Sequence, residues 1–155
     1  GEGKINLKVN TNGYGGRRLS KGISVLTNDE RKPITRLIIT GIVDKFYTLS
    51  SNLVKLEGAV GKEIERTITI TANEKYPFKI INTRAKVGRD ISYELKEVKN
   101  SDGKKYSLSV KNLKTQRGRY HDIISLKTDK NPLPEIIIRV VGNITDIDPK
   151  SQKPK

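Results

Sequence analysis

The chain has 155 residues, a formal net charge of +14 and no Cys, Met or Trp. Without Cys it can form no disulfide, thiol nucleophile, thiolate metal site or iron–sulfur cluster, and its single His cannot build a multi-histidine metal centre alone. No apolar run approaches the length of a membrane-spanning helix, and the polar N-terminus does not resemble a signal peptide. Because Met is absent, we expect a processed product, an expressed fragment or part of a longer protein.

The first elements along the chain belong to a segment that occurs twice. Residues 4–43 match residues 105–144 at a constant offset of 101 residues without a gap. The matches fall on alternate residues, which is the period of a strand with one buried face, so we predict three strands in each copy. The identical pairs are Lys4/Lys105, Leu7/Leu108, Val9/Val110, Arg18/Arg119, Ile23/Ile124, Ser24/Ser125, Thr27/Thr128, Pro33/Pro134 and Gly41/Gly142.

The offset indicates how the chain is divided into domains. It is close to the roughly 100 residues of an immunoglobulin-like β-sandwich. We therefore predict that residues 1–43 are the C-terminal strands of a first immunoglobulin-like domain and that residues 44–144 form a complete second domain. The remaining residues, 145–155, are expected to be a disordered tail because they are polar and contain two prolines.

Residues 44–144 carry β-branched and alternating apolar residues between turn-forming residues, which predicts a series of short strands. For example, Ile68 and Ile70 share one face of a strand whose other face carries Thr67 and Thr69. Since no segment has a helical period, the predicted fold class is all-β, an immunoglobulin-like antiparallel β-sandwich. The expected strands are residues 53–57, 63–72, 78–83, 91–96, 106–110, 120–126 and 136–144.

The last of these strands is apolar on both faces. Ile136 and Ile138 point inward in the predicted pattern, so Ile137 and Val141 should lie on the outward face. Two interpretations stay open for this candidate assembly surface: a loop or neighbouring module covers it, or a partner molecule binds there.

Three features of residues 1–43 resemble a known family. A Gly-rich opening leads into a strand, a second strand ends in Thr27-Asn28-Asp29, and Pro33 precedes a final strand that ends at Gly41. They resemble the end of a module in the bacterial domain-of-unknown-function family of hydin-like immunoglobulin-like modules, and residues 44–144 resemble a divergent second copy. The resemblance implies an immunoglobulin-like fold and export to the periplasm or cell surface. It implies no biochemical activity, and the family's Cys-Gly-Cys segment does not occur in this chain.

The polar motifs are typical of turns rather than of catalytic or metal centres. Asn28 and Asp29 can hydrogen-bond their own backbone, and they lack the spacing of a calcium loop. Residues 13–16 are Gly-rich but lack the Gly-Lys-Ser/Thr ending of a phosphate loop. His121 should point outward because Tyr120 points inward, and no acidic pair has a context that separates its pKa values. We predict no enzyme activity, no catalytic or metal-binding residue and no cofactor.

Positive charge gathers in and around the equivalent loop of each repeat. Such a basic stripe attracts nucleic acid, anionic lipid, acidic polysaccharide or an acidic protein face, or it serves solubility alone. Specific nucleic-acid binding is disfavoured because only Tyr14 places an aromatic ring in a loop. The candidate anion- or partner-binding residues are Arg17, Arg18, Lys21, Lys111, Lys114, Arg117 and Arg119.

Two functions follow from these features. The first is a non-enzymatic structural or adaptor protein of the bacterial envelope or cell surface that assembles with other chains through immunoglobulin-like modules. The second is a monomeric binding module that holds an anionic polymer or ligand through its basic loops. Salt separates them, because capture by Lys and Arg weakens with ionic strength and an apolar interface does not.

Overall fold

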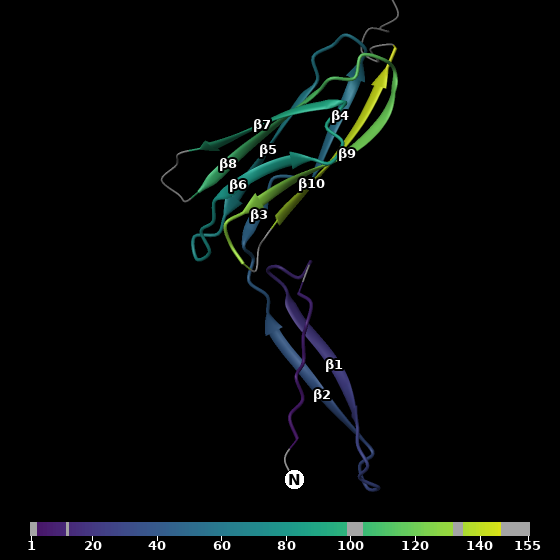
Figure 1. Ribbon diagram of the computed structural model, residues 1–155, viewed down its shortest axis with the longest axis vertical. Helices are drawn as coiled ribbons and strands as arrows, with labels where there is room; N and C mark the ends of the chain where they lie inside the picture. Colours follow the sequence, from purple (N-terminus) through teal and green to yellow (C-terminus); the bar gives the residue numbers. More distant parts are fainter. Residues whose placement is uncertain (1–2, 12, 99–103, 132–134, 147–155) are drawn as a thin grey trace, which may run out of the picture. The chain divides into compact units, whose positions relative to one another are not determined.

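A computed structural model describes residues 3–11, 13–98, 104–131 and 135–146. The chain divides into two compact units, Gly1–Lys45 and Phe46–Lys155, here called the first and second units (Figure 1). From residue 147 onward, the predicted tail lies outside the described residues. In the described part of the chain, no helix has the length and apolar character that a membrane span requires.

The first unit contains one antiparallel hairpin, formed by β1 (Arg18–Leu26) and β2 (Ile34–Ile42). Its turn is closed by Asp29, as the sequence predicts. The carboxylate Oδ1 of Asp29 accepts hydrogen bonds from the backbone N–H groups of Arg31, at 2.8 Å, and Lys32, at 3.2 Å. A short polar side chain thereby satisfies two amides that the strand ladder leaves unpaired.

Residues 3–11 form no strand, so the prediction of three strands in this copy is wrong for the first of them. The matching residues of the second unit form β8 (Lys105–Asn112), which is paired on one side with β5 (Glu65–Ala72) and on the other with β7 (Ile91–Val98). The described part of the first unit offers no such neighbours. Alternating sequence therefore yields a strand only where a neighbouring backbone completes the hydrogen bonds.

The second unit consists of two four-stranded sheets (Figure 1). In both sheets neighbouring strands are antiparallel, except that β4 runs parallel to β10. The first sheet has the order β4 (Leu53–Ala59), β10 (Glu135–Thr145), β9 (Gly118–Thr128) and β6 (Ile80–Ala85), and the second has the order β3 (Tyr47–Leu49), β5, β8 and β7.

The core lies between these sheets and is built from the inward side of each strand. Leu56, Ile124 and Ile138 of the first sheet pack in one cluster with Ile70 and Leu108 of the second, and all five are fully buried. Apolar burial of this kind supplies the main stabilising term for a small β-sandwich. The predicted fold class, an immunoglobulin-like antiparallel β-sandwich, is confirmed.

One strand of the second unit was not predicted. β3 has three residues, Tyr47 to Leu49, and pairs with the end of β5 through Leu49 and Ile70. Three residues are too few to show an alternating pattern, so only the position of β5 determines that this segment is a strand.

The closing hairpins of the two units, β1–β2 and β9–β10, have the same register after a shift of 101 residues. Leu19 faces Gly41 in the first unit, and Tyr120 faces Gly142 in the second. The side chains that point outward from β9–β10 therefore correspond to those that point away from the partly buried face of β1–β2. Whether the first unit is the end of an immunoglobulin-like domain stays a prediction.

Candidate protein-interaction surface

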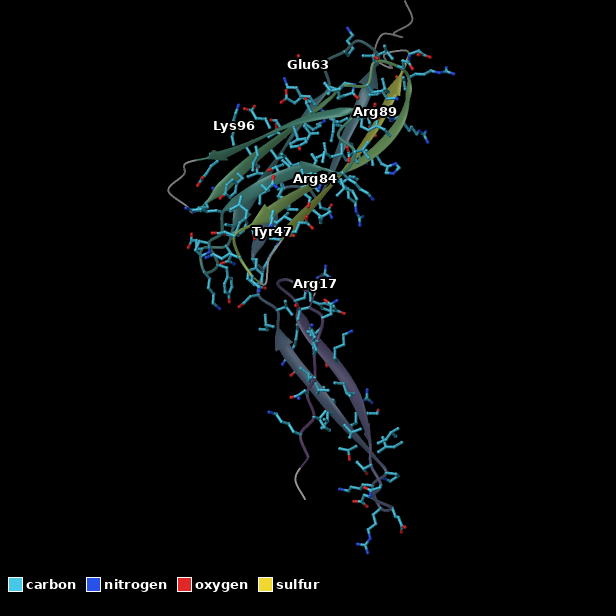
Figure 2. All side chains as sticks on the ribbon, viewed as in Figure 1. Arg17, Tyr47, Glu63, Arg84, Arg89 and Lys96 are labelled. Atoms are coloured by element: carbon cyan, nitrogen blue, oxygen red, sulfur yellow. The ribbon has the colours of Figure 1, made fainter. Side chains whose placement is uncertain are left out.

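The outward face of the first sheet carries cations and apolar residues side by side. On β10, Arg139 lies between Ile137 and Val141, two positions away from each, and it is directly opposite Ile123 of β9. Arg84 lies on β6 (Figure 2). It is opposite Ser125, which is in turn opposite Ile137. Cross-strand neighbours of this kind are about 4.5–5.5 Å apart. We call this surface the basic face and define it by Lys55, Arg84, Lys86, Ile123, Lys127, Ile137, Arg139 and Val141.

The two predicted assembly residues both lie on the basic face. Ile137 is 42% exposed and Val141 is partly exposed. No described loop buries Ile137, which favours the partner interpretation for that residue over cover by a loop. Ile123, which is also partly exposed, joins them from β9. Sequence alternation places Ile123 outward, but its proximity to Arg139 follows only from the β9–β10 register.

The outward face of the second sheet is different in composition. Its central residues on β5 and β8 are hydroxyl-bearing, and Thr67 and Ser109 are hydrogen-bonded to each other at 2.9 Å. Its charged side chains pair among themselves: Lys96 contacts Glu94 at 2.9 Å, and Lys111 contacts Glu63 and Glu65. Thr and Ser suit a solvent-facing strand, so this surface needs no partner.

The closing hairpin of the first unit also has an apolar outer face. Ile34, Ile38 and Ile42 follow one another on this side of β2 and are 61%, 63% and 79% exposed. Leu26 lies opposite Ile34, and the guanidinium of Arg36 lies over Gly22. Here too an Arg separates apolar positions on the outer side of the last strand. We call this surface the first hairpin face.

The three basic residues predicted in the first unit do not converge. Arg18 begins β1 opposite Ile42, on the first hairpin face. Lys21 is three residues further along the strand and therefore points to the other side, where its Nζ lies 5.5 Å from the ring centre of Tyr14. Arg17 precedes the strand, and its backbone carbonyl accepts a hydrogen bond from the N–H of Val43.

The four basic residues predicted in the second unit are also dispersed. Lys111 lies on β8, and its hydrogen bonds with the carboxylates of Glu63 and Glu65 raise the pKa of its ammonium group. Arg117 forms an ion pair with Asp146 at 3.0 Å. Lys111 and Arg117 are therefore already paired with acidic residues of the same chain.

The remaining two members of that group lie close to the β9 strand. The side chain of Lys114 packs beside Gly118, and Arg119 donates a hydrogen bond from Nε to Oδ1 of Asn143 at 3.4 Å. Arg119 shares the outward side of the first sheet with Arg84, Lys127 and Arg139, and these three cations were not among the predicted residues. Only the strand order places them together.

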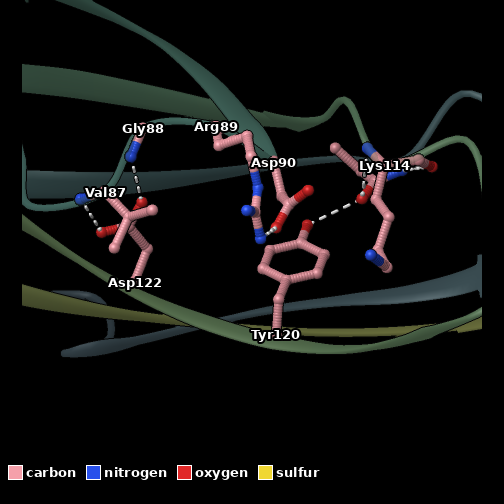
Figure 3. Close-up of polar contacts among 8 residues, drawn as sticks. Val87, Gly88, Arg89, Asp90, Lys114, Tyr120 and Asp122 are labelled. Atoms are coloured by element: carbon pink, nitrogen blue, oxygen red, sulfur yellow. Dashed lines mark hydrogen bonds and ion pairs between the residues drawn. The ribbon is translucent and has the colours of Figure 1, made fainter.

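Asp122 and Tyr120 have shifted pKa values, and both hold parts of the second unit together through hydrogen bonds (Figure 3). The buried Asp122 carboxylate accepts hydrogen bonds from the backbone N–H groups of Gly88 at 2.7 Å, Ile123 at 2.7 Å and Val87 at 3.0 Å. Burial raises the pKa of Asp122, but these hydrogen bonds outweigh it, so the pKa lies below its usual range.

Tyr120 points inward and His121 outward, as predicted. The hydroxyl of Tyr120 donates a hydrogen bond to Oδ1 of Asn112 at 2.7 Å. Burial raises the pKa of Tyr120 to about 12, and the carboxylates of Asp90 and Asp122 add to the effect. Among the described residues, no group of three or more His, Asp or Glu side chains could hold a metal ion.

Comparisons with known proteins concern the fold. No family model and no curated protein matches the sequence. A protein of unknown function from Porphyromonas gingivalis W83 is similar in structure, with 13% identity over 88% of this chain and 70% of that chain and a TM-score of 0.51. Another is PapD-like domain 7 of human CEP192, with 9% identity over 66% of this chain and 87% of that chain and a TM-score of 0.43. The first likeness shows a shared fold.

Proposed function

We propose that the protein is a non-enzymatic structural or adaptor protein that assembles with other polypeptide chains through the outer faces of its closing hairpins. A location in the bacterial envelope or at the cell surface is part of the proposal and rests on the family resemblance alone. The observation that carries the proposal is the exposure of Ile34, Ile38, Ile42 and Ile137 on corresponding sides of β2 and β10.

This exposure is costly in water and is useful only when another surface covers it. Each exposed Ile forgoes about 1.5–3 kcal/mol that burial would supply. A single exposed Ile is ordinary on a protein surface, but a run of three along one strand is typical of an interface. The same side of the closing hairpin carries exposed apolar residues in both units, although they occupy different positions of the repeat. Exposed apolar residues on this side of both hairpins support a shared binding role.

The polar chemistry supports a role without catalysis. Asp122, the buried carboxylate, already accepts hydrogen bonds from three backbone amides, so it is committed to holding the loop at residues 87–88. His121 lies opposite Val141 on the outward side of the first sheet. A general base must be free to accept a proton, so the commitment of the Asp122 carboxylate to backbone amides favours a structural role for it.

The proposal is tested by the size of the protein in extracts of the cells that naturally produce it. Size exclusion at low and high salt compares the wild-type chain with Ile38→Asp/Ile42→Asp and with Thr69→Asp. Thr69→Asp is the matched control, because Thr69 is exposed on the outer face of the second sheet. We expect the wild type and the control to elute in a complex larger than 17.4 kDa at both salts, and the double variant to elute in a smaller complex than the wild type.

Two results would contradict the proposal. Elution of the wild type as a monomer at both salts would show that nothing covers the hairpin faces. A complex that dissolves at high salt, equally for the wild type and the double variant, would show that an anionic polymer binds the basic residues instead. Circular dichroism of both variants confirms that folding is unchanged.

A further inference from the structure

We infer that the basic face of the second unit binds an acidic polypeptide segment that also carries apolar side chains. The inference rests on the proposed function, and it adds the chemistry of the partner.

The cations of the basic face form no ion pair with a described acidic residue. Among the described residues, the ion pairs engage Arg89, Lys96, Lys111 and Arg117, and none engages the basic face. The acidic residues of this side, Glu57 and Glu135, are outnumbered, and Glu135 accepts a hydrogen bond from Ser125. Positive potential therefore accumulates on one side of the sandwich. The cations of this face are Lys55, Arg84, Lys86, Lys127 and Arg139.

A solubilising surface would not be distributed in this way. If the excess charge served solubility alone, both outer faces would carry it with both signs mixed. The second sheet pairs Lys96 and Lys111 with acidic neighbours, whereas the more numerous cations of the basic face form no ion pair with a described acidic residue. The contrast between the two faces of one domain indicates that the first sheet is matched to an acidic surface.

Apolar residues alternate with these cations, which favours a polypeptide over a simple polyanion. Ile137, Val141 and Ile123 surround Arg139 at neighbouring positions of the β9–β10 ladder. A polysaccharide or nucleic-acid backbone would neutralise the cations and leave the apolar side chains in water. A polypeptide with acidic and apolar residues in alternation covers both, because its period of two residues matches that of the sheet.

The face is also hollowed beside its apolar residues. A recess of about 340 Å³ is lined by Val141, Arg119 and the acidic Glu57, among others. An apolar side chain of the partner can enter this recess next to Val141. A second copy of this chain is disfavoured as the occupant of this face, because each copy carries a net charge of +14.

Three fluorescein-labelled synthetic peptides test the inference on the full chain by fluorescence anisotropy. The first alternates Glu and Leu, the second alternates Glu and Ser, and the third alternates Lys and Leu. We expect the Glu–Leu peptide to bind and the Glu–Ser peptide to bind about tenfold more weakly, since it lacks apolar contacts. We expect no binding of the Lys–Leu peptide, and we expect the Glu–Leu affinity to fall as salt rises.

Three variants locate the binding. Ile137→Ser removes the most exposed apolar residue of the face and Arg139→Ser removes its central cation, and each should weaken Glu–Leu binding about tenfold. Lys111→Ser is the matched control, because this cation is on the other sheet and is already paired. Its binding should stay within about twofold of the wild type. Thermal unfolding of each variant confirms that the fold is retained.

Any of three results would overturn the inference. One is an absence of Glu–Leu binding; another is an equal loss in Lys111→Ser and Arg139→Ser. The third is Glu–Ser binding as tight as Glu–Leu binding and unaffected by Ile137→Ser, which would make the ligand a polyanion.

If the cellular complex persists while the Glu–Leu peptide fails to bind, the inference is wrong and the proposed function stands. If the peptide binds and the wild type is monomeric in cells, the proposed function is wrong.

Discussion

The ring of Tyr120 packs against the backbone of Gly142, its partner across the β9–β10 ladder. A Cβ atom built on Gly142 would lie 2.0 Å from Cε1 of Tyr120, which is far inside van der Waals contact. The ring fills the space that a side chain would take, and its hydroxyl reaches Asn112 of the second sheet. This pair joins the closing hairpin to the opposite sheet.

Replacement of Gly142 by Ala should therefore destabilise the second unit. We expect Gly142→Ala to cost about 1–3 kcal/mol in the free energy of unfolding, because the ring must shift in a packed site. Gly41→Ala is the matched control from the first unit, where no atom lies within 4 Å of the added Cβ. Urea unfolding measures both variants. Equal and small losses would show that the Tyr120 ring moves freely.

A compensating change sharpens this test. The first unit has Leu19 opposite Gly41, where the second has Tyr120 opposite Gly142. A smaller side chain should accept the added methyl group, so Tyr120→Leu should be less sensitive to Gly142→Ala than the wild type is. A double-mutant cycle gives the coupling between the two positions. A coupling of zero would contradict the packing described here.

Asp122 should make the stability of the second unit dependent on acid. Its folded-state pKa lies below the usual range, so its contribution is fully present above the pKa of the unfolded chain and is lost as pH falls through the folded-state value. Asp122→Asn should cost about 2 kcal/mol near neutral pH, since an amide cannot accept all three hydrogen bonds. It should also flatten the loss of stability at low pH.

The matched control for Asp122 is Asp146→Asn. Asp146 is largely exposed and pairs only with the exposed Arg117, so its loss should change stability little. Thermal unfolding across an acidic pH series compares the two variants. The structural role of Asp122 would be refuted by a variant whose pH profile and stability match those of Asp146→Asn.

Tyr120 should make the stability of the second unit depend on pH in the alkaline range. Its folded-state pKa of about 12 is above the value of 10.0 for a free tyrosine, so the folded state resists ionisation. Stability that is complete below pH 10 should fall as the pH rises towards 12. Burial also raises the pKa of Tyr47 and of Tyr106, so titration of tyrosinate absorbance should show several late-ionising groups, of which Tyr120→Phe removes one. A variant that titrates like the wild type would assign the late groups to other tyrosines.

Truncation of two neighbouring isoleucines on β10 should cost very different amounts of stability. Ile138 is fully buried in the core, and Ile137 is 42% exposed on the basic face. Ile138→Ala should cost about 2–5 kcal/mol and Ile137→Ala less than about 1 kcal/mol. Denaturant unfolding checks both values. Similar costs would mean that Ile137 is already covered within the chain, and its role in binding would then be lost.

The sequence predicted the buried half of this structure well because burial repeats every two residues along a strand. Ile124, Ile136 and Ile138 were assigned to the core from alternation alone, and all are buried. Alternation states which side a residue is on, but not which strand lies beside it. Residues 3–11 alternate as β8 does and form no strand, since no described strand of the first unit pairs with them.

The candidate surface was predicted only in part, for the same reason. Ile137 and Val141 were identified because they are close in sequence and share a face. Arg84 joins them through β9, which lies between β6 and β10, and no local pattern reports that order. The basic loops that the sequence emphasised are divided between the two sheets, and Lys111 is paired with acidic residues.

The central claim is that polypeptide partners cover the outer faces of the closing hairpins, and site-specific photo-crosslinking in the producing cells tests it most directly. A photoreactive residue replaces Ile38, Ile137 or Thr69 in turn, and adducts are analysed by mass spectrometry. We predict protein adducts from Ile38 and Ile137, with an acidic peptide at Ile137, and none from Thr69. Equal adducts at all three positions, or none at Ile38 and Ile137, would contradict the claim.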